Sequence, residues 1–149
     1  MPKQFSHLNA AGGARMVNVG AKSVQRRHVL AAGKLICRPA TILALKKKAL
    51  PKGDVLTVAQ IAGIQAAKRT AELIPLCHPL PLNHVKLGFK MLRGAVEIYC
   101  AVETSAQTGV EMEALTGVSV AALTLYDMCK SVDKTMRIGD IHVVEKVKS

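Results

Sequence analysis

Aromatic residues are scarce in this chain, which has no tryptophan, two phenylalanines and two tyrosines. Proteins that bind single-stranded nucleic acid stack its bases on aromatic faces, so the composition argues against that function. Long apolar runs are also absent, since no stretch approaches the roughly 20 uncharged residues of a membrane span. Residues 1–10 contain no apolar signal-peptide segment. We therefore expect no membrane segment and a cytoplasmic location, or the mitochondrial matrix in a eukaryote.

The four cysteines, at positions 37, 77, 100 and 129, are far apart and include no Cys-x-x-Cys pair. This spacing signals neither a zinc site nor a disulfide framework. We expect reduced, mostly buried thiols, and a protein that holds no metal and no other cofactor.

Acidic residues are absent from positions 1–53, which carry 11 lysines and arginines, whereas positions 54–149 carry 10 residues of each sign. The whole net charge of +11 therefore lies in the first third of the chain. Such an excess is either a solvated basic face or a surface that attracts a polyanion. Because aromatic residues are few, a small phosphate-bearing ligand fits this charge as well as nucleic acid does.

Hydrophobic periodicity predicts strands and long helices without the regular βαβ alternation of a parallel sheet. Pro39 suits the first turn of a helix, Asp54 is a candidate N-cap, and Arg93-Gly94 lies between the two strands of the clearest hairpin. We expect strands at 15–19, 24–37, 85–91, 96–102 and 138–147, and helices at 39–48, 55–69 and 110–131. These elements predict one α+β domain over residues 1–149, an antiparallel sheet with helices packed on one face.

The helix expected at 110–131 carries ionisable residues at both ends: Glu111 and Glu113 at its start, Asp127 and Lys130 near its end. Glu113 and Asp127 project to within about 40° of one face but stand roughly 21 Å apart along the axis. If both ends serve one active site, a second copy of the chain must supply one of them. Alternatively, the glutamates complement the helix dipole, while Asp127 and Lys130 form a local ion pair.

The segment 74–81 contains three prolines, which keep it extended and make it a rigid mount for ligand-contacting groups. Cys77 and His78 are neighbours whose side chains point in opposite directions in an extended chain, which argues against a Cys–His nucleophile pair. Alternatively, His78 only forms hydrogen bonds with nearby backbone groups. Lys52 and Lys68 can also be explained without a function. Lys52 is then a surface lysine in a turn, and Lys68 is a cation at a helix C-terminus.

Taken together, these segments resemble the MoaC family of cyclic pyranopterin monophosphate synthases, which act in molybdenum-cofactor biosynthesis. The resemblance runs in the same order from Phe5 to about Lys146. The stretches that carry it are KGD (52–54), AQIAGIQAAK (59–68), LIPLCHPL (73–80), TGVEMEALT (108–116) and AALTLYDMCK (121–130). The resemblance implies a ferredoxin-like fold and a homohexamer, a trimer of dimers with active sites at the dimer interface.

The resemblance also implies a reaction, the conversion of (8S)-3′,8-cyclo-7,8-dihydroguanosine 5′-triphosphate into cyclic pyranopterin monophosphate with release of pyrophosphate. The positions that match catalytic residues are Asp127, Lys52 and Lys130. Those that match substrate contacts, with their nearby candidates, are Leu76, Cys77, His78, Met112, Glu113, Glu111, Lys68 and Arg26. Ring opening and closure require several proton transfers, which lysines perform when their pKa is lowered. We assign Lys52 and Lys130 as acid/base groups and Asp127 as the group that orients Lys130.

The chain departs from the family's pattern at three places. Asn18 stands where the pattern has an aspartate, Gln25 stands where it usually has a threonine, and no Gly/Lys/Ser-rich tail follows the last strand. Two other functions therefore stay open: a basic protein that binds nucleotides or nucleic acid, and a catalytically inactive scaffold of the pathway. The intact central motifs favour the active enzyme.

Overall fold

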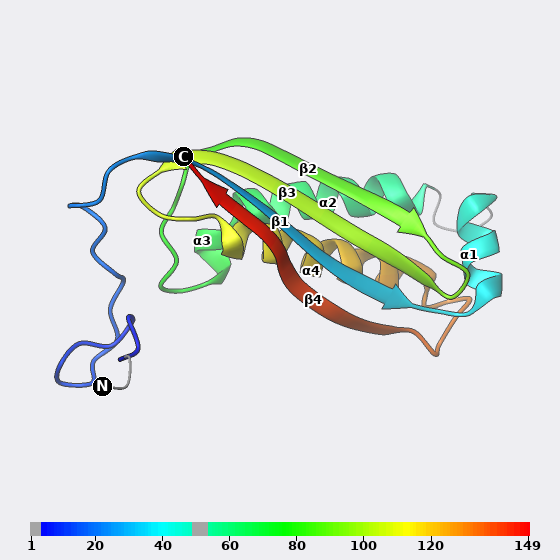
Figure 1. The fold of residues 1–149 in the computed structure, drawn as a ribbon. Helices are drawn as coiled ribbons and strands as arrows, with labels where there is room; N and C mark the ends of the chain where they lie inside the picture. Colours follow the sequence, from blue (N-terminus) through cyan, green and yellow to red (C-terminus); the bar gives the residue numbers. More distant parts are fainter. Residues whose placement is uncertain (1–3, 49–53) are drawn as a thin grey trace.

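The structure is a computed structural model that describes residues 4–48 and 54–149. Figure 1 shows how its helices and strands are arranged. In chain order they are β1 (Gln25–Ile36), α1 (Pro39–Lys46), α2 (Val55–Lys68), α3 (Thr70–Leu73), β2 (Leu82–Met91), β3 (Ala95–Ala106), α4 (Glu111–Cys129) and β4 (Arg137–Lys148).

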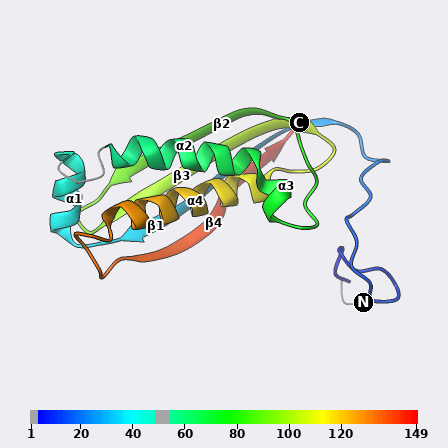
Figure 2. The same ribbon diagram turned by 180° about the vertical axis from the view of Figure 1, so that it is seen from behind.

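The four strands form one antiparallel sheet in the order β2-β3-β1-β4. Helices α2 and α4 lie side by side on one face of this sheet, as the opposite views in Figure 1 and Figure 2 show. The predicted α+β fold, with helices on one face of an antiparallel sheet, is confirmed. Within the described part of the chain, no helix has the length and apolar character of a membrane span.

The predicted helices and the hairpin are confirmed, although their ends differ by a few residues. Pro39 occupies the first turn of α1, where its missing N–H costs no hydrogen bond. The carboxylate of Asp54 caps α2, because it accepts hydrogen bonds from the backbone N (3.2 Å) and the Oγ1 (2.8 Å) of Thr57. Local sequence signals therefore identified how these helices begin.

The strand predicted at 15–19 is wrong. Those residues belong to an N-terminal arm (residues 4–24) that contains no helix and no strand apart from an isolated bridge between Leu8 and Ala14. The carbonyl oxygen of Val17 accepts a hydrogen bond from the side chain of His78 instead of from a neighbouring strand. The sequence analysis also missed α3, the short helix that ends before Pro75.

Small residues allow α4 to pack closely against both α2 and the sheet. A Cβ atom added at Gly63 of α2 would lie 2.8 Å from the carbonyl oxygen of Gly117 in α4. A Cβ atom added at Gly117 would in turn lie 2.7 Å from the Sγ of Cys100 in β3. The fully buried Ala114 and Ala121 continue this face of α4. The absence of large side chains at these positions therefore sets the spacing between the layers.

A buried carboxylate fixes the end of the molecule that lies beyond α4. Asp133 is 0% exposed, and its oxygens accept hydrogen bonds from Arg38 N (2.9 Å), Arg38 Nε (3.2 Å), Thr41 Oγ1 (2.8 Å), Thr135 N (2.9 Å) and Thr135 Oγ1 (2.7 Å). Burial alone raises the pKa of Asp133, but these hydrogen bonds outweigh burial and hold the pKa well below its ordinary value. The ionised side chain thus ties the segment after α4 to the start of α1.

Gly63→Ala should lower the free energy of unfolding by about 1–3 kcal/mol, the usual cost of overpacking, because the added methyl group meets the backbone of α4. Denaturant titration followed by circular dichroism measures this change. Gly88→Ala in β2 is the control, since a Cβ there meets nothing within 4 Å, and it should change stability by less than about 0.5 kcal/mol. Wild-type stability of Gly63→Ala contradicts the close approach of the two helices.

Candidate active site

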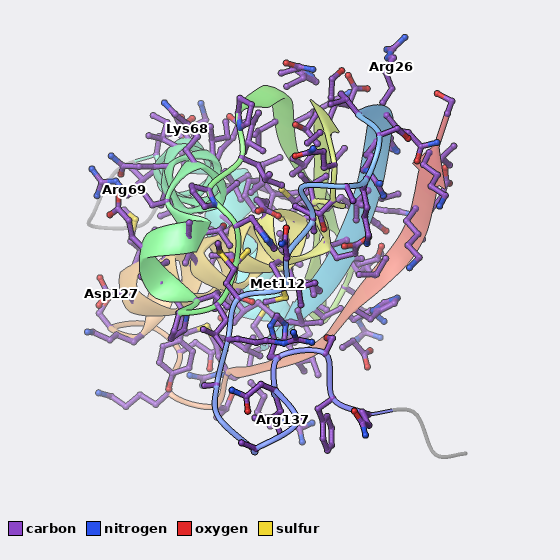
Figure 3. All side chains as sticks on the ribbon, turned by 90° about the vertical axis from the view of Figure 1, so that its left-hand side faces the viewer. Arg26, Lys68, Arg69, Met112, Asp127 and Arg137 are labelled. Carbon is purple, nitrogen blue, oxygen red and sulfur yellow. The ribbon has the colours of Figure 1, made fainter. Side chains whose placement is uncertain are left out.

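A cleft of about 620 Å³, here called the main cleft, opens where the N-terminal arm, the segment between α3 and β2, and the start of α4 meet. Figure 3 faces this end of the molecule, with Met112 near the middle of the view. The lining is largely apolar with a few polar groups, as in many small-molecule sites. The cleft brings together five predicted substrate contacts: Leu76, Cys77, His78, Glu111 and Met112.

Glu113, a sixth predicted substrate contact, is buried beside the main cleft. Its side chain lies in the first turn of α4 and is 3% exposed. The Sγ of Cys77 lies 3.6 Å from its Oε1, whereas its Oε2 has no hydrogen-bond partner among the described residues. Burial raises the pKa of Glu113, and the neighbouring Glu111 adds to the increase. A buried carboxyl oxygen without a partner is unusual in a folded protein, and it leaves Glu113 able to accept a further hydrogen bond.

Cys77 and His78 point to different partners, as their neighbouring positions predicted. Burial, followed by the nearby carboxylate of Glu113, raises the pKa of Cys77 to about 11, so its thiol is protonated at neutral pH. The Nε2 of His78 lies 2.6 Å from the carbonyl oxygen of Val17, which can only accept, so that nitrogen carries the proton. The two side chains form no nucleophilic pair, and His78 fastens the N-terminal arm to the edge of the cleft.

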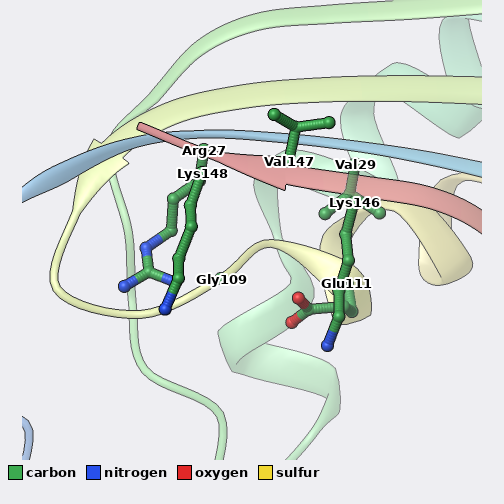
Figure 4. Close-up of a pocket in the computed structure, with 7 residues that line it drawn as sticks. All are labelled: Arg27, Val29, Gly109, Glu111, Lys146, Val147 and Lys148. Carbon is green, nitrogen blue, oxygen red and sulfur yellow. The ribbon is translucent and has the colours of Figure 1, made fainter.

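A second hollow of about 240 Å³, here called the basic pocket, adjoins the main cleft. Figure 4 shows the side chains of Arg27 and Lys148 projecting toward the loop that carries Gly109, whereas the side chain of Lys146 projects toward Glu111. Gly109 and Glu111 line both hollows, so the two are neighbours at the start of α4. Three cations beside an apolar cleft are suited to an anion attached to a less polar group.

Sequence reasoning missed these three cations because Arg27 is far from Lys146 and Lys148 in the chain. The pairing of β1 with β4 places Arg27 opposite Lys148 and Val29 opposite Lys146. The available signal was the alternation of lysines at 146 and 148 in the last strand, which puts both on one face. Without the register between the strands, nothing in the sequence linked them to Arg27 or to the helix start at Glu111.

The sequence matches the MoaC family over residues 16–149. The chain belongs to the MoaC family. Among its relatives is the cyclic pyranopterin monophosphate synthase of Chloroflexus aggregans, which is 57% identical over 145 residues, 96% of this chain and 88% of the relative. The proteins of the same name from Chloroflexus aurantiacus and Parvibaculum lavamentivorans are 55% and 51% identical, over 96% and 97% of this chain and 89% and 91% of their own lengths.

The catalytic pair that the MoaC resemblance implies lies away from both hollows. Lys130 Nζ is 2.6 Å from Asp127 Oδ1, and the two side chains are 57% and 59% exposed. Neither residue lines the main cleft or the basic pocket, and α4 runs unbroken between Glu113 and Asp127. The predicted ion pair between Asp127 and Lys130 is present. The hydrogen bond to Asp127, together with the charge of that carboxylate, raises the pKa of Lys130, opposite to the shift that a catalytic base needs.

Lys68 and Arg26, the other predicted substrate contacts, do not line the main cleft. Lys68, at the end of α2, lines a hollow that shares Leu80 with the main cleft. Arg26 lines a hollow that shares Arg27 and Val147 with the basic pocket. Figure 3 shows Lys68 and Arg26 near the outer edge of this end of the molecule. Lys52 lies outside the described residues. Within residues 4–48 and 54–149, no group of three or more His, Cys, Asp or Glu side chains is placed to hold a metal ion.

Asn18, the departure from the family's pattern, has a local structural role. Its Oδ1 accepts a hydrogen bond from the backbone N of Gly20 at 2.9 Å, which stabilises the turn of the arm. An aspartate can make the same contact, since it also offers a side-chain oxygen two residues before the amide. The substitution therefore preserves the backbone path of the arm beside the cleft.

Glu113→Gln should make the protein more stable than wild type by an amount that grows with pH. The raised pKa means that the folded state holds its proton more tightly than the unfolded chain does. The resulting stability is complete below the unfolded pKa, about 4.3, and is lost as the pH rises through the folded value. Denaturant titrations between about pH 4 and pH 8 measure the difference. Glu145→Gln, at an exposed position of β4, is the charge-matched control, and an equal pH trend in both variants contradicts the interpretation.

Proposed function

We propose that this protein is an enzyme of molybdenum-cofactor biosynthesis that converts (8S)-3′,8-cyclo-7,8-dihydroguanosine 5′-triphosphate into cyclic pyranopterin monophosphate and pyrophosphate. The relatives named cyclic pyranopterin monophosphate synthase support this proposal. The observation that carries it is that the main cleft and the basic pocket are neighbours, with Gly109 and Glu111 lining both. One part suits a fused-ring base, and the other suits a triphosphate.

The basic pocket is proposed to hold the phosphates. Arg27, Lys146 and Lys148 line it together, and Arg27 is itself held by hydrogen bonds to the carbonyl oxygens of Ala106 and Gln107. Closing the cyclic monophosphate is a displacement at the α-phosphorus in which pyrophosphate leaves. Fixed positive charges stabilise the negative charge that develops on that leaving group.

The proton transfers are assigned to Lys52 and Lys130, with Asp127 orienting Lys130. Because its contact with Asp127 raises the pKa of Lys130, this lysine carries its proton at neutral pH and is suited to donating it or to stabilising an anion. Accepting a proton from the substrate is then assigned to Lys52. The buried Glu113 and the protonated thiol of Cys77 are proposed to contact the base, together with Leu76, His78 and Met112.

A second copy of the chain is proposed to complete each site. The Asp127–Lys130 pair lies roughly 21 Å along α4 from Glu113, beyond the reach of one small molecule. The proposed assembly is a homohexamer, a trimer of dimers of single-domain subunits with a ferredoxin-like fold, whose active sites lie at the dimer interface. Its proposed location is the cytoplasm, as the bacterial relatives suggest.

Asp127→Asn should lower kcat at least about 100-fold, the lower range for loss of an acid/base group, because Lys130 loses its ionic partner. The assay supplies the cyclic nucleotide and measures pyrophosphate and pterin formation. Asp140→Asn removes an exposed carboxylate on β4 and is the matched control, which should keep wild-type activity. Absence of product from folded, oligomeric wild-type protein rejects the enzyme and leaves the scaffold or nucleic-acid functions.

Mixing Lys52→Ala chains with Asp127→Ala chains tests the shared site. If the two residues of one site come from different subunits, random exchange within dimers should restore about one quarter of the wild-type activity, because half of the dimers are mixed and each holds one intact site. Each variant alone should be inactive under the same conditions. No recovery after exchange, verified by native mass spectrometry, shows that these two residues do not come from different chains.

A further inference from the structure

One wall of the main cleft is formed by the N-terminal arm rather than by a helix or strand. The residues of the arm that line the cleft are Ser6, His7, Val17, Val19 and Lys22. The arm has no ladder of backbone hydrogen bonds to the sheet, so side chains of the body must hold it in place. Its position therefore depends on a small number of contacts.

Among the residues that the structure describes, two side chains of the body donate hydrogen bonds to the backbone of the arm. His78 contacts the carbonyl oxygen of Val17 at 2.6 Å. The Nε2 of Gln107 contacts the carbonyl oxygens of Gly20 at 3.4 Å and Lys22 at 3.1 Å. Gln107 follows the last residue of β3 and does not itself line the main cleft.

The backbone at Gln107 is fixed from the opposite side. Arg27 of β1 donates from its guanidinium to the carbonyl oxygens of Ala106 (3.4 Å) and Gln107 (3.3 Å). The next two residues, Thr108 and Gly109, line the main cleft. Gln107 thus joins three parts of the site: the arm, the basic pocket through Arg27, and the floor of the cleft.

We propose that Gln107 is a positioning residue of this enzyme, which holds the arm against the main cleft and so sets the space available to the substrate. This inference rests on the proposed function. Gln107 acts through the carbonyl oxygens of Gly20 and Lys22, not by touching the substrate. If the arm contacts the substrate equally well in the ground state and in the transition state, loss of those contacts raises KM and leaves kcat unchanged.

Gln107→Met tests the proposal, because methionine has a similar length and no charge but donates no hydrogen bond. We expect KM to rise about five- to thirtyfold, as expected for the loss of one or two neutral hydrogen bonds, with kcat changed less than about twofold. Trypsin should also cleave after Lys22 faster than in the wild type. Gln107→Asn keeps the amide donor but has a shorter side chain, so its KM and its cleavage rate should lie between those of the wild type and Gln107→Met.

Two controls separate positioning from a general structural effect. Asn83→Met removes an exposed amide that contacts Ser105 at 3.4 Å and no residue of the arm, so it should leave KM and the cleavage rate unchanged. Val19→Ala should raise KM in the wild type but add little in Gln107→Met, since the arm is already displaced.

The inference is overturned if Gln107→Met keeps the wild-type KM and cleavage rate, or if it lowers kcat alone. Absence of turnover by the wild type instead contradicts the proposed function. The rate of tryptic cleavage at Lys22 does not depend on turnover, so the two ideas fail separately.

Discussion

The positions of Glu113 and Asp127 depend on the close packing of α4 against its neighbour α2 and against the sheet. Gly117 lets the helix approach Gly63 on one side and Cys100 on the other. An unbroken, buried helix in this place holds Glu113 beside the cleft and Asp127 at the far end of the molecule. Because the helix cannot bend to bring its ends together, the geometry of the fold itself requires that a complete site use more than one chain, if both ends serve it.

Two buried carboxyl groups show how the same side-chain chemistry is used in different ways. Asp133 is surrounded by five donors, so its charge is stabilised and it serves the fold. Glu113 has a weak thiol donor on one oxygen and no described donor on the other, so its charge is costly in the absence of a ligand. A fully satisfied acid needs no further partner, whereas Glu113 keeps the capacity to bind one. The oxygen without a described donor, rather than burial alone, distinguishes Glu113 from Asp133.

Helix starts and the hairpin were predictable because their signals are local: the cap at Asp54, the proline at 39 and the alternation in 85–102. The N-terminal arm was not, since the alternation at 15–19 resembles a strand and only tertiary contacts with His78 and Gln107 show otherwise. Five of the predicted substrate contacts do gather in the cleft, all of them from the 74–80 and 108–113 motifs. The basic pocket depends on the register between β1 and β4, which no short-range pattern specifies. The placement of Lys52 stays a prediction.

The environment of Cys77 lowers the reactivity of its thiol toward electrophiles and oxidants. With a pKa of about 11, only about one molecule in ten thousand carries the thiolate at pH 7. Peroxides and alkylating electrophiles react with the thiolate form, so this sulfur is shielded from them even though it borders an open hollow. Inhibitors designed around covalent capture of that atom would therefore react slowly with this protein.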